Sequence, residues 1–108
     1  MSILGRWRIA EMPDYQGDYP DMVKPAYILF DKSGGEFAFG CVTGAIHGTA
    51  SGNAIAFTWS GSDEMDESSG EGWAELRDDG TLEGEISFLN GDDATFIARR
   101  WDGFSTAC

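Results

Sequence analysis

Residues 54–60, which read Ala-Ile-Ala-Phe-Thr-Trp-Ser, decide the fold class because large apolar side chains occupy every second position. A strand with one buried face places alternate side chains inside the protein, so Ile55, Phe57 and Trp59 are expected to point inward together. Residues 81–89 repeat the alternation. Its expected inward positions are Leu82, Gly84, Ile86 and Phe88. These two stretches predict strands of a sheet with one solvated face.

Further strands are predicted on both sides of this stretch, separated by short turns rich in Gly, Asp and Asn. In residues 36–48 the apolar positions change parity near Gly40 and Cys41, which predicts a glycine bulge that bends one long strand. An acidic loop is expected over residues 61–71, and residues 14–25 follow no regular period. The predicted strands cover residues 5–12, 26–32, 36–48, 54–60, 72–77, 81–89 and 94–101.

The predicted strands follow one another with short connections, and pairing the last with the first removes both exposed sheet edges. We therefore predict an all-β fold, an antiparallel up-and-down meander of seven or eight strands closed into a barrel. A chain of 108 residues has room for one core, so residues 1–101 are expected to form a single domain, followed by a disordered tail at 102–108.

The charge of the chain limits its partners. Nineteen acidic residues against seven basic ones give a formal net charge of -12, which repels phosphate backbones and anionic lipid headgroups. We expect no direct binding to nucleic acid or to membranes. Residues 1–8 lack the apolar core of a secretory signal, so we expect a cytoplasmic protein in which Cys41 and Cys108 are free thiols. It is expected to be a monomer or a homodimer.

Two short motifs lie at the ends of the predicted barrel. Gly5-Arg6-Trp7 opens the first strand, and Arg99-Arg100 ends the last one. These motifs resemble the calycin barrels, the lipocalins and avidins, in which a Gly-x-Trp begins the first strand and a late basic residue packs across the Trp ring. The resemblance implies a calycin-like barrel closed by Gly5, Trp7 and either Arg99 or Arg100, with a cation over indole contributing about 0.5–2 kcal/mol.

Residues 35–40 and 59–66 also resemble segments of small bacterial proteins that carry no assigned activity. Neither resemblance implies a cofactor, and none is expected.

The aromatic side chains provide the leading functional hypothesis. Phe37, Phe39, Phe57, Trp59, Trp73 and Phe88 lie on predicted strands at spacings that could aim them inward. Such residues either fill the core or line a ligand cavity. The leading hypothesis is a non-catalytic binding module that holds a small apolar or aromatic molecule at one mouth of the barrel, with Trp59 and Trp73 as the wall. The predicted ligand-binding residues are Trp59, Trp73, Phe57, Phe39 and Tyr19.

The densest charge cluster consists of Asp63, Glu64, Asp66 and Glu67. It lacks the alternating Asp-x-Asp-x-Asp-Gly run of a calcium-binding EF-hand loop, so no metal site is expected. The second hypothesis makes this cluster an interaction surface that docks a basic protein partner.

His47 is the only histidine, so a hydrolase or isomerase with a histidine base would have to use it. The nearby hydroxyls of Thr43 and Thr49 do not have the spacing of a catalytic triad. No catalytic residue is therefore predicted, and an enzyme using His47 is the third hypothesis.

Overall fold

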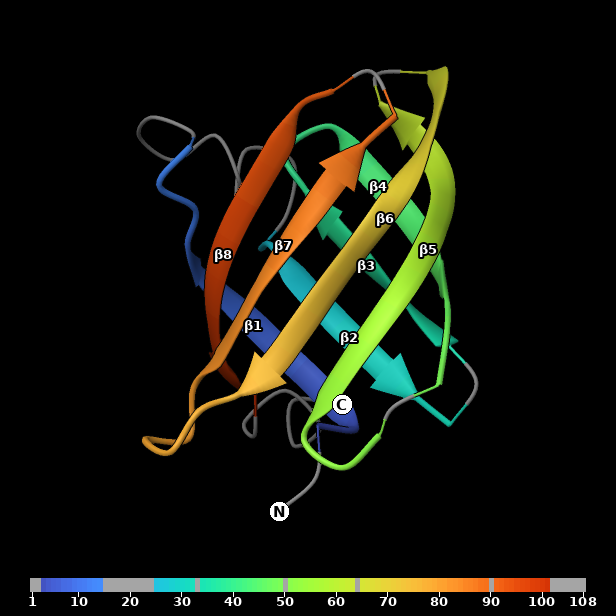
Figure 1. Cartoon of the computed structure of the whole chain (residues 1–108). Helices are drawn as coiled ribbons and strands as arrows, with labels where there is room; N and C mark the ends of the chain where they lie inside the picture. The colour runs from blue at the N-terminus through green and yellow to red at the C-terminus, as the bar shows by residue number, and fades with distance from the viewer. Residues whose placement is uncertain are drawn as a thin grey trace, which may run out of the picture.

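Strands account for most of the chain in the computed structural model, which describes residues 3–14, 25–32, 34–49, 51–63, 65–89 and 91–101. Within these ranges they form a closed antiparallel barrel in sequential order, with the last strand paired to the first (Figure 1). The predicted all-β meander is thereby confirmed. The eight strands are β1 (Gly5–Glu11), β2 (Tyr27–Asp31), β3 (Gly34–Phe39), β4 (Val42–His47), β5 (Ala54–Asp63), β6 (Asp66–Leu76), β7 (Leu82–Phe88) and β8 (Asp93–Arg100).

Aromatic rings occupy the middle of the barrel. The Trp59 ring meets Phe37 edge-on with centroids 5.2 Å apart, and it meets Phe88 in the same way at 5.1 Å. Each such pair contributes about 0.5–1.5 kcal/mol beyond the area it buries. The largest fully buried side chains include Trp7, Trp59, Phe30, Phe37, Phe39 and Phe96.

Glycines on the inner face make room for these rings. A Cβ atom at Gly44 would lie 2.7 Å from the Phe37 ring, and one at Gly72 would lie 2.4 Å from the Phe57 ring. Real Cβ atoms do not approach other atoms so closely, so a side chain at either position would displace an aromatic ring. Part of the high glycine content therefore belongs to the core and not to turns.

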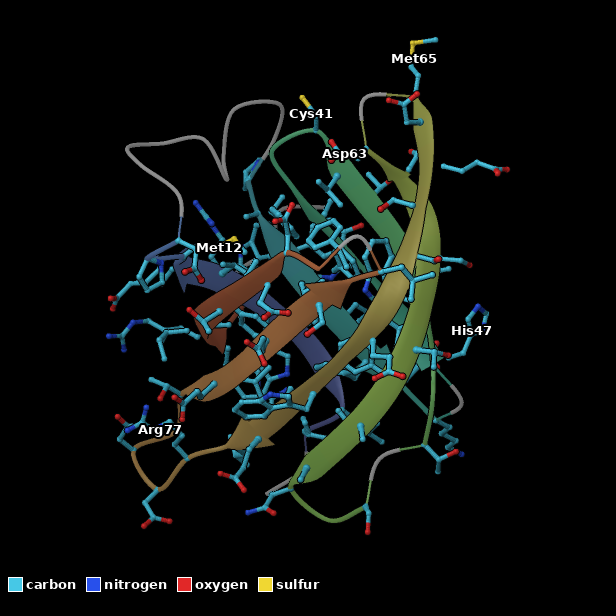
Figure 2. All side chains as sticks on the ribbon, turned by 45° about the horizontal axis from the view of Figure 1, so that its top comes forward. Met12, Cys41, His47, Asp63, Met65 and Arg77 are labelled. Atoms are coloured by element: carbon cyan, nitrogen blue, oxygen red, sulfur yellow. The ribbon has the colours of Figure 1, made fainter. Side chains whose placement is uncertain are left out.

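The bulge predicted near Gly40 is wrong, because the chain reverses there completely. Phe39 at the end of β3 is paired with Val42 at the start of β4, which leaves a two-residue turn. Gly40 has a φ of 55°, a conformation that glycine adopts without steric cost and that a tight hairpin turn requires. Cys41, half-buried, is the second residue of this turn (Figure 2).

The acidic loop predicted over residues 61–71 is also wrong, because both strands continue through most of it. Ser62 pairs with Glu67, and Asp63 pairs with Asp66, so the hairpin turn contains two residues. Alternation did not reveal these strand ends because they hold no large apolar residue. Met65 lies at the tip of the hairpin, is 97% exposed and has a φ of 78° (Figure 2).

The first and last strands are joined by a side-chain contact near the start of β1 and the end of β8. The Arg100 Cζ atom lies 4.0 Å from the centroid of the buried Trp7 ring, and Arg100 Nη1 donates a 2.7 Å hydrogen bond to the Leu4 carbonyl. Gly5 has a φ of 122°, and a Cβ there would lie 2.6 Å from Arg100 Nη1. The contact is thus made by Arg100, whereas Arg99 is exposed on the outer face.

The irregular segment predicted over residues 14–25 lies mostly outside the described residues. Its first residue is described: the Asp14 carboxylate accepts hydrogen bonds from the Thr95 backbone N–H at 2.8 Å and the Thr95 hydroxyl at 2.9 Å. These bonds hold the pKa of Asp14 below its ordinary value. The contact ties the end of the β1 region to β8. The predicted tail at 102–108 is outside the described residues.

Candidate interaction surface

The predicted ligand-binding residues do not lie together. Phe39, Phe57 and Trp59 are buried in the core, Trp73 is 41% exposed on the outer face, and Tyr19 is outside the described residues. Trp73 points outward because its neighbours on β6, among them Ala74, are the inward positions. The pair of Trp59 and Trp73 therefore cannot form one wall of a barrel mouth, and that part of the leading hypothesis is wrong.

The polar atoms of the interior are already used. The Trp59 Nε1 atom donates to the Ser87 carbonyl at 3.1 Å, and the Trp7 Nε1 atom donates to the Ile3 carbonyl at 2.9 Å. Across the described ranges, no buried side-chain nitrogen or oxygen lacks a hydrogen-bond partner. Ligand sites orient their ligands with a few polar groups that point into the cavity. Both buried indole N–H groups are therefore already engaged by backbone carbonyls of the protein itself.

Trp73 lies at the centre of an acidic outer face. On β6 it stands between Glu71 and Glu75, two residues away on either side, and across the ladder it pairs with Glu85 of β7. Its Nε1 atom donates to Glu85 Oε1 at 3.3 Å, which fixes one edge of the ring. Glu83 lies on β7 two residues from Glu85 and is the last of the five residues in this acidic face. We call these five residues the Trp73 face.

Carboxylates on this face oppose one another. Glu75 and Glu83 are directly paired across β6 and β7, an arrangement that destabilises a sheet by up to about 1 kcal/mol. Arg77 lies 3.4 Å from Glu83, but both side chains are nearly half exposed, so this ion pair contributes little. The face thus keeps an acidic surplus at some cost to stability.

The outer face of β1, which is three strands from β6, carries two arginines. Arg6 and Arg8 lie on β1, four strands from β5, and their guanidinium groups lie 5.8 Å from the Tyr27 ring centroid and 6.0 Å from the Trp101 ring centroid. Tyr27 also donates a hydrogen bond to Glu36. Burial, followed by this hydrogen bond, raises the pKa of Tyr27 to about 12. Basic groups are not confined to β1, because Arg77 follows β6 and Arg99 is exposed on β8.

Hollows line the outer surface beside the Trp73 face. One of about 460 Å³ is bordered by Thr49, Ser51, Ala54, Ala56, Trp73 and Glu75, together with Ile55 and Ala74. A second, of about 340 Å³, is bordered by His47, Ala56, Thr58 and Glu71, together with Phe57 and Gly72. Ala56 belongs to both, so the two hollows adjoin.

The predicted acidic cluster is only partly assembled. Asp63 and Asp66 form the last pair before the hairpin tip, and Glu64 is outside the described residues. Glu67 is exposed and shares the outward parity of β6 with Glu71. Glu67 thus extends the acidic row of β6, whereas Asp63 and Asp66 belong to the end of the hairpin.

His47 lies on the outer surface at the end of β4 and points away from the barrel (Figure 2). It pairs with Thr58, which in turn pairs with Glu71, so a base, a hydroxyl and a carboxylate lie on adjacent strands. All three belong to the described part of the chain, and no side-chain hydrogen bond joins any two of them. Since a nucleophile needs such a bond to its base, this arrangement gives no support to the enzyme hypothesis.

Neither a metal site nor a membrane span is found among the described residues. No three His, Cys, Asp or Glu side chains within those ranges are arranged to hold a metal ion. The same ranges contain no helix with the length and apolar character needed to cross a membrane.

Comparisons with known proteins add nothing to these observations: no family model, no curated protein and no solved structure matches the chain. The Trp73 face was missed in the sequence because Trp73 was assigned to the apolar face of its strand. The signal was present in residues 71–75, Glu-Gly-Trp-Ala-Glu, where Trp has the same parity as both glutamates.

Proposed function

We propose that this protein is an interaction module that binds a Lys- or Arg-rich segment of a partner protein through the Trp73 face. The observation that carries the proposal is the exposed indole of Trp73 surrounded by Glu71, Glu75, Glu83 and Glu85. Tryptophan is one of the residue types that most often anchor protein interfaces. A cation placed over its ring gains about 0.5–1 kcal/mol at an exposed site, and nearby carboxylates add to that attraction.

The charge distribution supports a basic partner. The formal net charge is -12, and four of the five residues of the Trp73 face are glutamates. A surface of one sign steers an oppositely charged partner during encounter and disfavours anionic partners. The paired glutamates at positions 75 and 83 fit this role, because a bound cation would relieve their repulsion.

We also infer that the barrel is of the calycin type. The support is the packing of Arg100 across the Trp7 ring, next to a glycine whose φ of 122° few other residues adopt. This inference concerns the fold and assigns no ligand.

The test uses octalysine as a probe of defined chemistry. We expect isothermal titration calorimetry to detect binding at about 0.05 M salt and to find it strongly weakened at about 0.5 M, where screening is severe. In the double variant Glu71→Gln, Glu85→Gln the affinity should fall about tenfold, since each exposed charge contributes about 0.2–1 kcal/mol.

The matched control removes two charges elsewhere. The control double variant Glu11→Gln, Asp93→Asn replaces exposed carboxylates on β1 and β8 and removes the same number of negative charges. We expect this variant to bind octalysine within about twofold of the wild type. Equal weakening in both variants, or no binding by the wild type, would contradict the proposed function.

A further inference from the structure

The outer face of β5 carries only small side chains, whereas the neighbouring strand β6 carries large ones at every outward position except Ser69. Its outward residues are Ala54, Ala56, Thr58, Ser60 and Ser62. In register with them on β6 are Glu75, Trp73, Glu71, Ser69 and Glu67. The side chains of β5 therefore form a low floor beside a taller wall of carboxylates and one indole.

The two adjoining hollows that share Ala56 lie along this floor, and we call them together the β5 groove. The side of the groove opposite Trp73 and Glu71 is formed by His47 and Thr49. A third hollow of about 730 Å³ lies further along the same hairpin and includes Ser60, Ser69 and Glu67. In Figure 1 the hairpin of β5 and β6 runs the full length of the barrel.

We propose that the β5 groove binds the partner's basic segment as an extended chain, lying along β5 with alternate side chains turned toward the β6 wall. The proposal rests on the proposed function, because the same wall supplies the charge. It adds the conformation of the partner and the spacing of its cations.

Spacing along the wall selects the extended form. Glu67, Glu71 and Glu75 are four residues apart on one strand, which is about 13 Å per step, and Trp73 stands midway between the last two. An extended peptide repeats with the same rise, so five cations at every second position face Glu67, Ser69, Glu71, Trp73 and Glu75 in turn, and all but the one at Ser69 meet a carboxylate or the indole. A helix advances only about 6 Å in four residues and matches one or two of them.

Charge complementarity favours another protein over a second copy of this chain. Two copies would each bring a formal net charge of -12. The outward arginines of β1, Arg6 and Arg8, already lie near the rings of Tyr27 and Trp101. Like net charge opposes association at low salt, whereas a short basic segment gains from the whole wall.

The test compares two nine-residue peptides of identical composition, each with five lysines and four threonines. In one peptide lysine occupies every odd position, and in the other the five lysines are contiguous. We expect calorimetry to show at least tenfold tighter binding of the alternating peptide, because only its lysines all face the wall when it is extended. Equal affinity for the two peptides would overturn the inference.

Groove-filling variants locate the binding. Ala56→Phe fills the position shared by both hollows, and Ala10→Phe adds the same ring to an exposed alanine on β1. Trp73→Ala removes the indole of the wall without adding bulk. We expect Ala56→Phe and Trp73→Ala each to abolish the preference for the alternating peptide, and Ala10→Phe to retain it, with near-ultraviolet circular dichroism confirming that each variant is folded.

The outcomes separate the two proposals. Octalysine binding that depends on Glu71 and Glu85, together with no effect of Ala56→Phe or Trp73→Ala on the peptide preference, would overturn the groove and leave the proposed function standing. If the wild type does not bind octalysine, both the groove proposal and the proposed function are wrong. A wild-type dimer that Ala56→Phe makes monomeric, and that the alternating peptide does not dissociate, would assign the groove to a second copy and overturn the inference.

Discussion

Replacing Arg100 by methionine tests how the barrel is closed. Methionine keeps an unbranched side chain of similar length but removes the cation that lies 4.0 Å from the Trp7 ring centroid and the donor to the Leu4 carbonyl. A partly desolvated cation over indole contributes about 2 kcal/mol. A hydrogen bond from a charged donor contributes about 1.5–3 kcal/mol. Because Arg100 is half-buried and water can replace part of this bond, we expect a loss of about 3 kcal/mol in the free energy of unfolding.

The assay is equilibrium unfolding in urea, followed by tryptophan fluorescence. With a slope of about 1.5 kcal/mol per molar urea, the Arg100→Met midpoint should fall by about 2 M. Arg100→Lys keeps the cation but loses the planar guanidinium group. Its urea midpoint should lie between those of Arg100→Met and the wild type.

Arg99→Met is the matched control, since it removes the same side chain one residue earlier on the exposed face of β8. Its effect should stay within about 0.5 kcal/mol, as is usual for surface substitutions. If the two methionine variants shift the midpoint equally, or if neither shifts it, the packing of Arg100 on Trp7 does not hold the barrel closed.

Three further predictions concern the core, a turn and acid stability. Gly44→Ala should lower the free energy of unfolding by about 1–3 kcal/mol, because its Cβ would lie 2.7 Å from the Phe37 ring; an unchanged urea midpoint would contradict the tight packing. Met65→Gly should raise the thermal midpoint, because at a φ of 78° glycine avoids a cost of about 1 kcal/mol; a lower midpoint would contradict this. Hydrogen bonds from the Thr81 hydroxyl and backbone N–H hold the pKa of Asp79 below its ordinary 3.8, so the stability that its ionised form contributes is present above that value and lost as the pH falls through the lower folded-state pKa. Asp79→Asn should therefore have a lower free energy of unfolding than the wild type at neutral pH, and the difference should disappear in acid. A difference that stays constant with pH would exclude this linkage.

Much of the barrel could be predicted from the sequence because its core obeys strict alternation. Ile55, Phe57 and Trp59 have the inward parity in both the sequence and the structure, and the strands close in chain order as expected. The choice between Arg99 and Arg100 could not be made, because Phe96 and Ile97 are adjacent apolar residues and alternation alone does not decide which of them points inward.

The wrong predictions concern positions where the pattern of apolar residues does not indicate which face of the strand a side chain occupies. At Gly40 a parity shift is compatible with either a bulge or a reversal, and only the pairing of the flanking strands decides between them. In the hairpin tip, serines and acidic residues on both faces hid the strands. Trp73 was assigned inward by its residue type, although its glutamate neighbours two positions away share its parity and are exposed.

The most direct test of the account is a nuclear magnetic resonance titration of the ¹⁵N-labelled protein with the alternating lysine peptide. We predict that the largest amide shifts fall on residues 54–62 of β5 and 67–75 of β6, and that the Trp73 indole N–H moves with them. Amide shifts concentrated on β1 and β2, or on the buried Trp59 indole in the core, would contradict the proposal that this barrel binds basic segments on its outer face.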